Sequence, residues 1–355
     1  MNPKRLVSGI LATAAMGALI ASCNSKAPPP DEPSPAAPQA ATQPQAASDQ
    51  SSRISTAPKA LKPPGPRSPA PAPAEIWTLF SGDKAFTEVS KQVAIGPRPS
   101  GSANLEKARG AILASLNASG WDVEKQEFTD HTPHGPIKFT NLIARFSAST
   151  ERPASSATQR AIVCSHYDTK HFSTISFVGA SDGASSTGAL LELARVLAFD
   201  PVLASKVELV FFDGEEAIVQ FDDADTDGLY GSRFYAKTLR TSQRAKQFKF
   251  GILWDMIGDK DLTITLPTDS PETLVKEIFA AADSLGVRSH FGYFDRAIKD
   301  DHYPLNRIQI PTIDLIDFNY LPWHTADDTL DKLSPESLRT VGAVTLLQLR
   351  KALSK

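Results

Sequence analysis

Two kinds of apolar pattern follow one another along most of the chain, beginning near residue 75. Longer runs with helical spacing or a largely apolar composition predict helices at 103–119, 185–198, 229–239 and 271–285. Short continuous apolar runs predict buried strands at 161–164, 207–212, 250–254 and 310–316. Gly120 is typical of the residue after a helix, and Ser334-Pro335-Glu336 is typical of the start of a last helix. Buried strands between helices predict one α/β domain with a central, mostly parallel mixed sheet covered by helices on both faces.

The first residues have the pattern of a targeting segment. Lys4 and Arg5 precede an apolar stretch at 6–19, which is short for a membrane span and is followed by a polar run. Ile20-Ala21-Ser22-Cys23 resembles a bacterial lipobox, in which the cysteine is lipidated and becomes the mature N-terminus. We therefore expect a lipoprotein signal peptide at 1–23, although an ordinary signal peptide with a chance cysteine has the same pattern.

This interpretation places the protein in the cell envelope, where a lipid on Cys23 would tether it to the periplasmic or extracellular face of a membrane. Asn24 follows the cysteine instead of the aspartate that usually signals retention at the inner membrane. The outer membrane is therefore favoured if the host has two membranes.

Residues 24–74 differ in composition from the rest of the chain. Residues 24–74 hold roughly half of the 27 prolines, and no aromatic residue occurs before Trp77. Such a segment cannot bury enough apolar surface to offset the entropy of ordering it, so we expect an extended, disordered linker. The remaining part, 75–355, is long enough to bury a core and is expected to be the catalytic domain.

The net charge and the two cysteines limit which partners and which metal ligands can be expected. A formal net charge of −3 over 355 residues gives no indication of a nucleic-acid partner. The two cysteines, Cys23 and Cys164, lie in such different regions that we do not expect them to form a disulfide. Because there is no cysteine cluster, any metal site must use His, Asp and Glu side chains.

Acids and histidines follow the predicted strands one after another, where sites form in parallel sheets. These residues are His166, Asp168, Asp182, Asp213, Glu215, Glu216, Asp255 and His324. Each has an ordinary alternative, because Glu215-Glu216 suits a solvated loop, Asp182 a helix cap and His324 a packed core position. His302 within Asp300-Asp301-His302 suits a turn. Together they favour a functional site, since unrelated occurrences would not all fall at strand ends.

Three of these residues have the chemistry of a catalytic zinc site. Asp182, Glu216 and His324 would give three protein ligands and leave one position open. A zinc ion held this way polarises a carbonyl or activates water. Glu215 is adjacent to Glu216 but can point elsewhere on a bent loop, and we expect it to be the general acid/base. Like-charged neighbours and a partly dry site should raise its pKa.

Five motifs in order resemble the zinc aminopeptidase superfamily. They are SHYD (165–168), GASDGA (179–184), FFDGEE (211–216), DMIG (255–258) and HTADD (324–328). Within that superfamily the chain resembles the glutaminyl-peptide cyclotransferases from about residue 95 to the end. This narrower resemblance rests on TPHG (132–135), FTN (139–141), EA (216–217), LYGSR (229–233), DDHYP (300–304) and Trp323 before His324.

The resemblance implies a role for each site residue. Asp182, Glu216 and His324 would bind one Zn²⁺ per chain, and Glu215 would move the proton. Asp255 and Asp300 would form an acidic hydrogen-bond arrangement beside the substrate, with Trp323 lining the pocket. Phe221 stands where animal cyclases tend to have a tryptophan, so it would form part of the same wall. The position of His166 binds a second zinc, together with that of Asp255, in dinuclear aminopeptidases.

The expected reaction converts the N-terminal glutamine of peptides or proteins to pyroglutamate and releases ammonia. A dinuclear zinc aminopeptidase of the same fold is the main alternative. Trp323 and the stretch 300–302 favour the cyclase over this alternative. A non-enzymatic lipoprotein that only binds its partner is a further alternative. The presence of usable ligands or bases at all five motifs disfavours it.

Overall fold

The computed structural model describes residues 72–146, 160–221 and 226–353. Cys23, the predicted signal peptide and residues 24–71 of the predicted linker lie outside these ranges. Within them, no helix is both long enough and apolar enough to cross a membrane.

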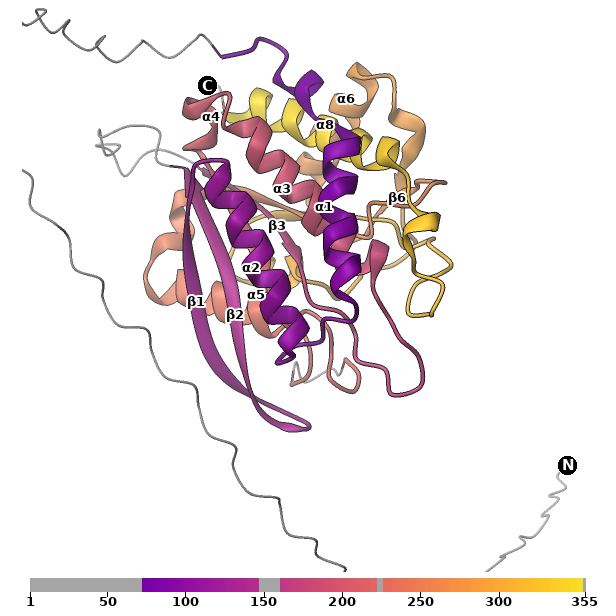
Figure 1. Ribbon diagram of the computed structural model, residues 1–355. Coiled ribbons are helices and arrows are strands. Elements are labelled where there is room, and N and C mark those ends of the chain that lie inside the picture. The colour runs from indigo at the N-terminus through magenta and orange to yellow at the C-terminus, as the bar shows by residue number, and fades with distance from the viewer. Residues whose placement is uncertain (1–71, 147–159, 222–225, 354–355) are drawn as a thin grey trace, which may run out of the picture. The chain divides into compact units, whose positions relative to one another are not determined.

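A six-stranded mixed sheet forms the centre of the described chain (Figure 1). Its order is β1-β2-β4-β3-β5-β8, and the strands β4, β3, β5 and β8 run parallel. The bounds are β1 Trp121–Thr132, β2 Gly135–Phe146, β3 Arg160–His166, β4 Val207–Phe212, β5 Phe248–Asp255 and β8 Thr312–Ile316. Two short strands, β6 Ile264–Leu266 and β7 Phe291–Tyr293, pair separately. The predicted mostly parallel mixed sheet is confirmed.

Helices cover both faces of this sheet, as predicted. One face carries α1 Gly82–Ile95, α2 Ala103–Ala118, α3 Ser186–Leu197, α6 Glu272–Ser284 and α8 Pro335–Leu353; Figure 1 shows α1, α2 and α3 in front of the strands. The other face carries α5 Tyr230–Thr241 and α7 His302–Arg307. Shorter elements are α4 Pro201–Ala204, a π-type turn Ala180–Ser185, and 3-10 turns Ile76–Leu79, Arg244–Gln247, Arg288–His290 and Leu330–Lys332.

Alternate residues of the central strands enter two different cores. In β3, Val163 packs in the larger core beneath α1, α3 and α8, whereas Ile162 and Cys164 pack in the smaller core beneath α5. Successive strand side chains point to opposite faces, so a strand covered on both faces is apolar throughout. This explains why the central strands are continuous apolar runs in the sequence.

The outer hairpin of β1 and β2 was not predicted. The two strands pair antiparallel from Trp121↔Phe146 to Thr132↔Gly135, and β2 also pairs antiparallel with β4. Many positions of β1 are exposed, because it is an edge strand. Its polar composition therefore carries no continuous apolar signal.

Candidate active site

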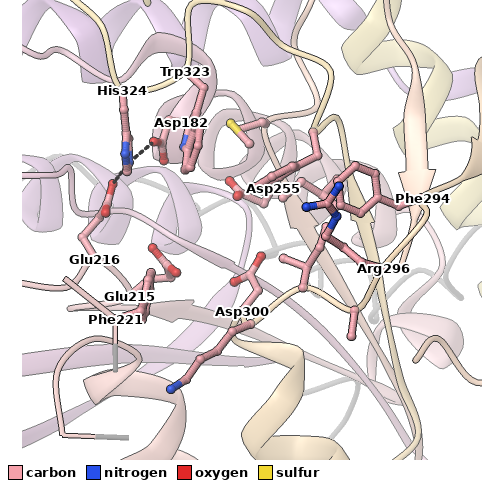
Figure 2. Close-up of a pocket in the computed structure, with 16 residues that line it drawn as sticks. Asp182, Glu215, Glu216, Phe221, Asp255, Phe294, Arg296, Asp300, Trp323 and His324 are labelled. Atoms are coloured by element: carbon pink, nitrogen blue, oxygen red, sulfur yellow. Dashed lines mark hydrogen bonds and ion pairs between the residues drawn. The ribbon is translucent and has the colours of Figure 1, made fainter. Parts of the chain in front are cut away.

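The predicted site residues meet at the carboxyl ends of the parallel strands. A cavity of about 270 Å³ is lined by Asp182, Glu215, Glu216, Phe221, Asp255, Asp300, Trp323 and His324, among others (Figure 2). His166, the last residue of β3, is fully buried and does not line the cavity, but it contacts Asp182 and Asp255, which do. All nine residues to which the resemblance gave a place at the site are thus brought together, whereas Asp213 pairs with Arg109 and does not line the cavity.

Asp182, Glu216 and His324 form a group that fits a metal ion. Nε2 of His324 lies 3.2 Å from Oε1 of Glu216 and 3.4 Å from Oδ2 of Asp182. One ligand atom from each residue lies within 4.8 Å of the others, and Oδ2 of Asp182 is buried without a hydrogen-bond partner. Two carboxylates and one imidazole converging on one point suit zinc, and they need a positive charge between them.

The pKa of His324 also indicates that the two acids need a positive charge between them. Burial acts to lower this pKa, but the nearby carboxylates of Asp182 and Glu216 outweigh it and raise the pKa to about 10. A proton on the imidazole therefore balances the two acids when no cation lies between them. A bound cation would take that place and leave His324 neutral, as a ligand must be.

Asp182 also belongs to a second group. Nε2 of His166 lies 3.2 Å from Oδ1 of Asp182 and 3.2 Å from Oδ1 of Asp255. The three ligand atoms again lie within 4.8 Å of one another. Asp182 therefore presents one oxygen to each histidine, which is the arrangement that a second metal position requires.

The loop that carries Asp182 is held from several directions. Asp328 accepts the backbone N–H of Ser181 at 2.7 Å and of Asp182 at 3.1 Å. The fully buried guanidinium of Arg98 donates to the carbonyl oxygen of Val178 at 2.8 Å. Gly183 has φ +86°, and a Cβ there would lie 2.6 Å from the carbonyl oxygen of Asp168. The backbone therefore fixes where the carboxylate points.

The carboxylates of Glu215 and Glu216 point in different directions, as predicted for a bent loop. Asp168 accepts the backbone N–H of Glu215 at 3.2 Å and of Glu216 at 3.3 Å, and Leu229 donates its N–H to the carbonyl oxygen of Glu215 at 2.8 Å. Figure 2 shows Glu216 beside His324, while Glu215 lies on the side of Asp300. Asp168 thus shapes the loop through its hydrogen bonds to these two N–H groups.

Three acids of the cavity, Glu215, Asp255 and Asp300, have raised pKa values. Burial raises the pKa of Glu215 well above its usual range, and the negative charge of Asp300 adds to the effect. Burial likewise raises the pKa of Asp300, and it raises the pKa of Asp255 to about 7. Such groups suit proton transfer, because a useful catalytic pKa lies near the working pH.

Comparison with known proteins identifies the family. The model of peptidase family M28 matches residues 141–348. Glutaminyl-peptide cyclotransferase of Drosophila melanogaster is 31% identical over 258 residues, covering 65% of this chain and 70% of the fly protein. The crystal structure of an Acidobacteriales bacterium glutaminyl cyclase is 33% identical with a TM-score of 0.68, covering 82% of this chain and 98% of that chain. The chain belongs to the glutaminyl-peptide cyclotransferases of peptidase family M28.

The fold is shared beyond this cyclotransferase family. A Zn-dependent exopeptidase from Parabacteroides distasonis is 26% identical with a TM-score of 0.68, covering 78% of this chain and 99% of that chain. The fold alone therefore does not distinguish a cyclase from an exopeptidase.

Aromatic rings surround His324. Trp323 stacks on His324 with ring centroids 4.2 Å apart, and Phe318 lies 5.1 Å from Trp323. The edges of Phe172 and Phe177 approach the same imidazole at 5.5 and 5.8 Å. His324 itself has φ +56°, a left-handed conformation that the surrounding rings and loop must hold in place.

Two further features were not found by sequence reasoning. Lys170 donates its backbone N–H to Oε1 of Glu216 at 3.1 Å, and its ammonium lies 3.8 Å from Oε2. His302 is a buried first residue of α7 and not an exposed turn residue, with Nδ1 3.6 Å from Asp314 and Nε2 3.4 Å from Asp269. Neither contact has a local sequence signal, because each joins segments far apart in the chain.

Proposed function

We propose that the protein is a zinc-dependent glutaminyl-peptide cyclotransferase, which converts the N-terminal glutamine of peptides or proteins to pyroglutamate and releases ammonia. The observation that carries this proposal is the position of Glu215. Its buried carboxylate, with a raised pKa, lines the same cavity as the metal-binding group and Asp300. A proton carrier thus stands beside the place where a carbonyl would be polarised.

Asp182, Glu216 and His324 would hold one zinc ion, in keeping with their convergence and the buried unpartnered oxygen of Asp182. A zinc ion held there would polarise the side-chain amide carbonyl of the substrate and stabilise negative charge on its oxygen. Asp328, Asp168 and Lys170 hold these ligands in place through backbone and charge contacts.

The protein's own residues account for the movement of protons. The α-amine of the substrate attacks its side-chain amide carbon, forming the ring C–N bond, and Glu215 accepts the proton that the amine loses. Glu215 then gives this proton to the departing nitrogen as the old C–N bond breaks, so that ammonia leaves and Glu215 is restored. Asp255 and Asp300 face the same space and would orient the amine or Glu215. Trp323 and Phe221 would exclude water and press the amine towards the carbonyl.

A dinuclear aminopeptidase is the second candidate, favoured by one observation. His166, Asp182 and Asp255 form a further convergent group that shares Asp182 with the first. Two metal ions there would supply an activated hydroxide for peptide hydrolysis. Metal analysis distinguishes the candidates, because the cyclase requires one zinc per chain and the peptidase two.

Metal dependence gives a direct test of the proposed site. Chelation should abolish turnover of a Gln-initiated peptide, and added zinc should restore it. His324→Ala should lose both the zinc and the activity, since it removes one of three ligands. Full activity in metal-free protein would contradict the proposal.

We also propose that Cys23 carries a lipid anchor in the cell envelope, with the linker as a spacer. The support is the order of a basic start, an apolar stretch and small residues before this cysteine. Metabolic labelling with a fatty acid should mark the wild-type protein, and Cys23→Ala should remove the label. An unlabelled wild-type protein would overturn the anchor without affecting the proposed reaction.

A further inference from the structure

A second cavity lies beside the candidate active site, on the face of the sheet covered by α5 and α7. It has a volume of about 140 Å³ and is lined by five basic side chains: Arg233, Lys237, Arg240, Lys299 and Arg307. None of the described residues that line it is an aspartate or a glutamate. This basic groove contrasts with the whole chain, whose formal net charge is −3.

The positive charge is organised by the two helices. Arg233, Lys237 and Arg240 follow one another at four- and three-residue spacing on α5, which places them along one side of the helix. Lys237 and Arg240 are exposed to solvent. From α7, Arg307 lies over the ring of Tyr303 at 5.6 Å. Arg233 has a carboxylate at 4.0 Å, that of Asp130, so Lys237 and Arg240 are the residues on which a ligand would chiefly depend.

The floor of the groove is apolar. Leu229, Ala236, Pro304 and Ile308 line it between the basic residues. Such a surface suits a peptide better than a small hydrated anion. The backbone and the aliphatic parts of the peptide's side chains can make apolar contacts that also contribute to binding.

The groove and the active-site cavity share a residue. Lys299 lines both, and it directly precedes Asp300 of the proposed proton-transfer group. The two cavities are therefore neighbours, with Lys299 between them. A peptide whose first residue lies beside Glu215 would have to pass Lys299 to reach the groove.

We propose that the basic groove is an exosite for the substrate, which binds acidic residues in the segment that follows the N-terminal glutamine. This inference rests on the proposed function and adds a substrate class to it: peptides or proteins that begin with glutamine and continue with an acidic stretch. Surface charges of this kind act mainly by attracting and holding the ligand. The exosite should therefore lower KM more than it changes kcat.

The test compares two Gln-initiated peptides of equal length, one with aspartate and glutamate after its second residue and one with serine and glutamine there. For the wild-type protein at low salt, kcat/KM should be roughly three- to tenfold higher for the acidic peptide, as expected for a few exposed ion pairs. Because salt screens exposed charges, this ratio should fall towards one at about 1 M salt.

Variants locate the effect. In K237E/R240E the ratio should fall to one or below. The control K249E/K351E changes the net charge by the same amount, but its lysines line a separate cavity beside α6 and α8, on the face of the sheet opposite to α5 and α7. Both lysines are exposed, and the control should keep the wild-type ratio.

Three results would overturn the exosite. In the first, the wild-type ratio of kcat/KM for the two peptides does not change with salt. In the second, both double variants lose this ratio equally. In the third, the K237E/R240E protein keeps its peptide ratio but loses binding to vesicles of anionic lipid. The last would assign the groove to a membrane surface. Binding of a fluorescently labelled acidic peptide measures the groove apart from turnover. Peptide that binds through Lys237 and Arg240 but is never cyclised would contradict the proposed function and not the exosite.

Discussion

The carboxylate of Asp328 accepts the backbone N–H of Asp182 at 3.1 Å and so joins the loop of one proposed zinc ligand to the segment that carries another, His324. Asp328 also accepts the hydroxyl of Tyr320 at 2.7 Å. Asp328→Ala should weaken zinc binding by about 10–100-fold, as the loss of groups that orient metal ligands does. Competition with a chelator measures this affinity.

Asp327 provides the matched control for that variant. It is the neighbouring residue but is exposed. Asp327→Ala should leave the zinc affinity within about twofold of wild type, since solvent-exposed substitutions have small effects. Equal affinities in Asp328→Ala and the wild type would show that the loop is held by other contacts.

Glu215→Gln tests the proton carrier separately from the metal. Glutamine keeps the shape of the side chain but cannot accept and return a proton. We expect the zinc content to remain and kcat to fall by about 10²–10⁴-fold. Zinc analysis and steady-state kinetics on the same preparation check both statements. A variant with normal kcat would exclude Glu215 from this role.

The acidic surroundings of Glu215 predict a shift in the pH profile. Glu215 acts as a base only when deprotonated. The value of kcat/KM should therefore be high above the pKa of Glu215 and should fall as the pH drops through that pKa. After burial, the charge of Asp300 is the main influence that raises this pKa. Asp300→Asn removes that charge, so the acid limb should move to lower pH whatever happens to the maximal rate. An unmoved limb would mean that another group sets it.

Trp323 tests the wall of the cavity. It stacks on His324 but is not a ligand, so Trp323→Ala should reduce cyclisation and leave the zinc in place. Loss of a large flat contact for the substrate should lower kcat/KM by roughly tenfold or more, the cost of about 1.4 kcal/mol. Leu321→Ala is the control, because Leu321 is a nearby apolar residue with 93% of its surface exposed. Similar losses in both variants would remove any specific role for the tryptophan.

The sequence predicted the parts of the fold that have a strong local pattern. The strand at 207–212 was predicted with the bounds that the structure gives, and Gly120 follows α2 with φ +81°. The meeting of most of the predicted acids and histidines was also predictable, because they follow strands whose carboxyl ends lie at one edge of the sheet.

The residues that hold the site could not be predicted in the same way. Asp168 was recognised only as one more acid after a strand, yet it holds the loop of Glu215 and Glu216 through backbone N–H groups. Asp328 holds Asp182 across 146 residues of chain. Such contacts arise from tertiary packing, whereas a sequence pattern reports mainly on periodicity and local turns. The basic groove was missed for a related reason, since Lys299 and Arg307 join the α5 side chains only after folding.

The product formed from a Gln-initiated peptide tests the central claim most directly. The purified protein, loaded with zinc, is incubated with that peptide and with Leu- and Ala-initiated controls, and all products are identified by mass spectrometry. We predict that the Gln-initiated peptide loses one ammonia with every peptide bond intact, that the controls stay unchanged, and that the protein holds one zinc per chain. Release of free N-terminal amino acids by a protein holding two zinc ions, the second bound by His166 and Asp255, would contradict the cyclase and establish the aminopeptidase.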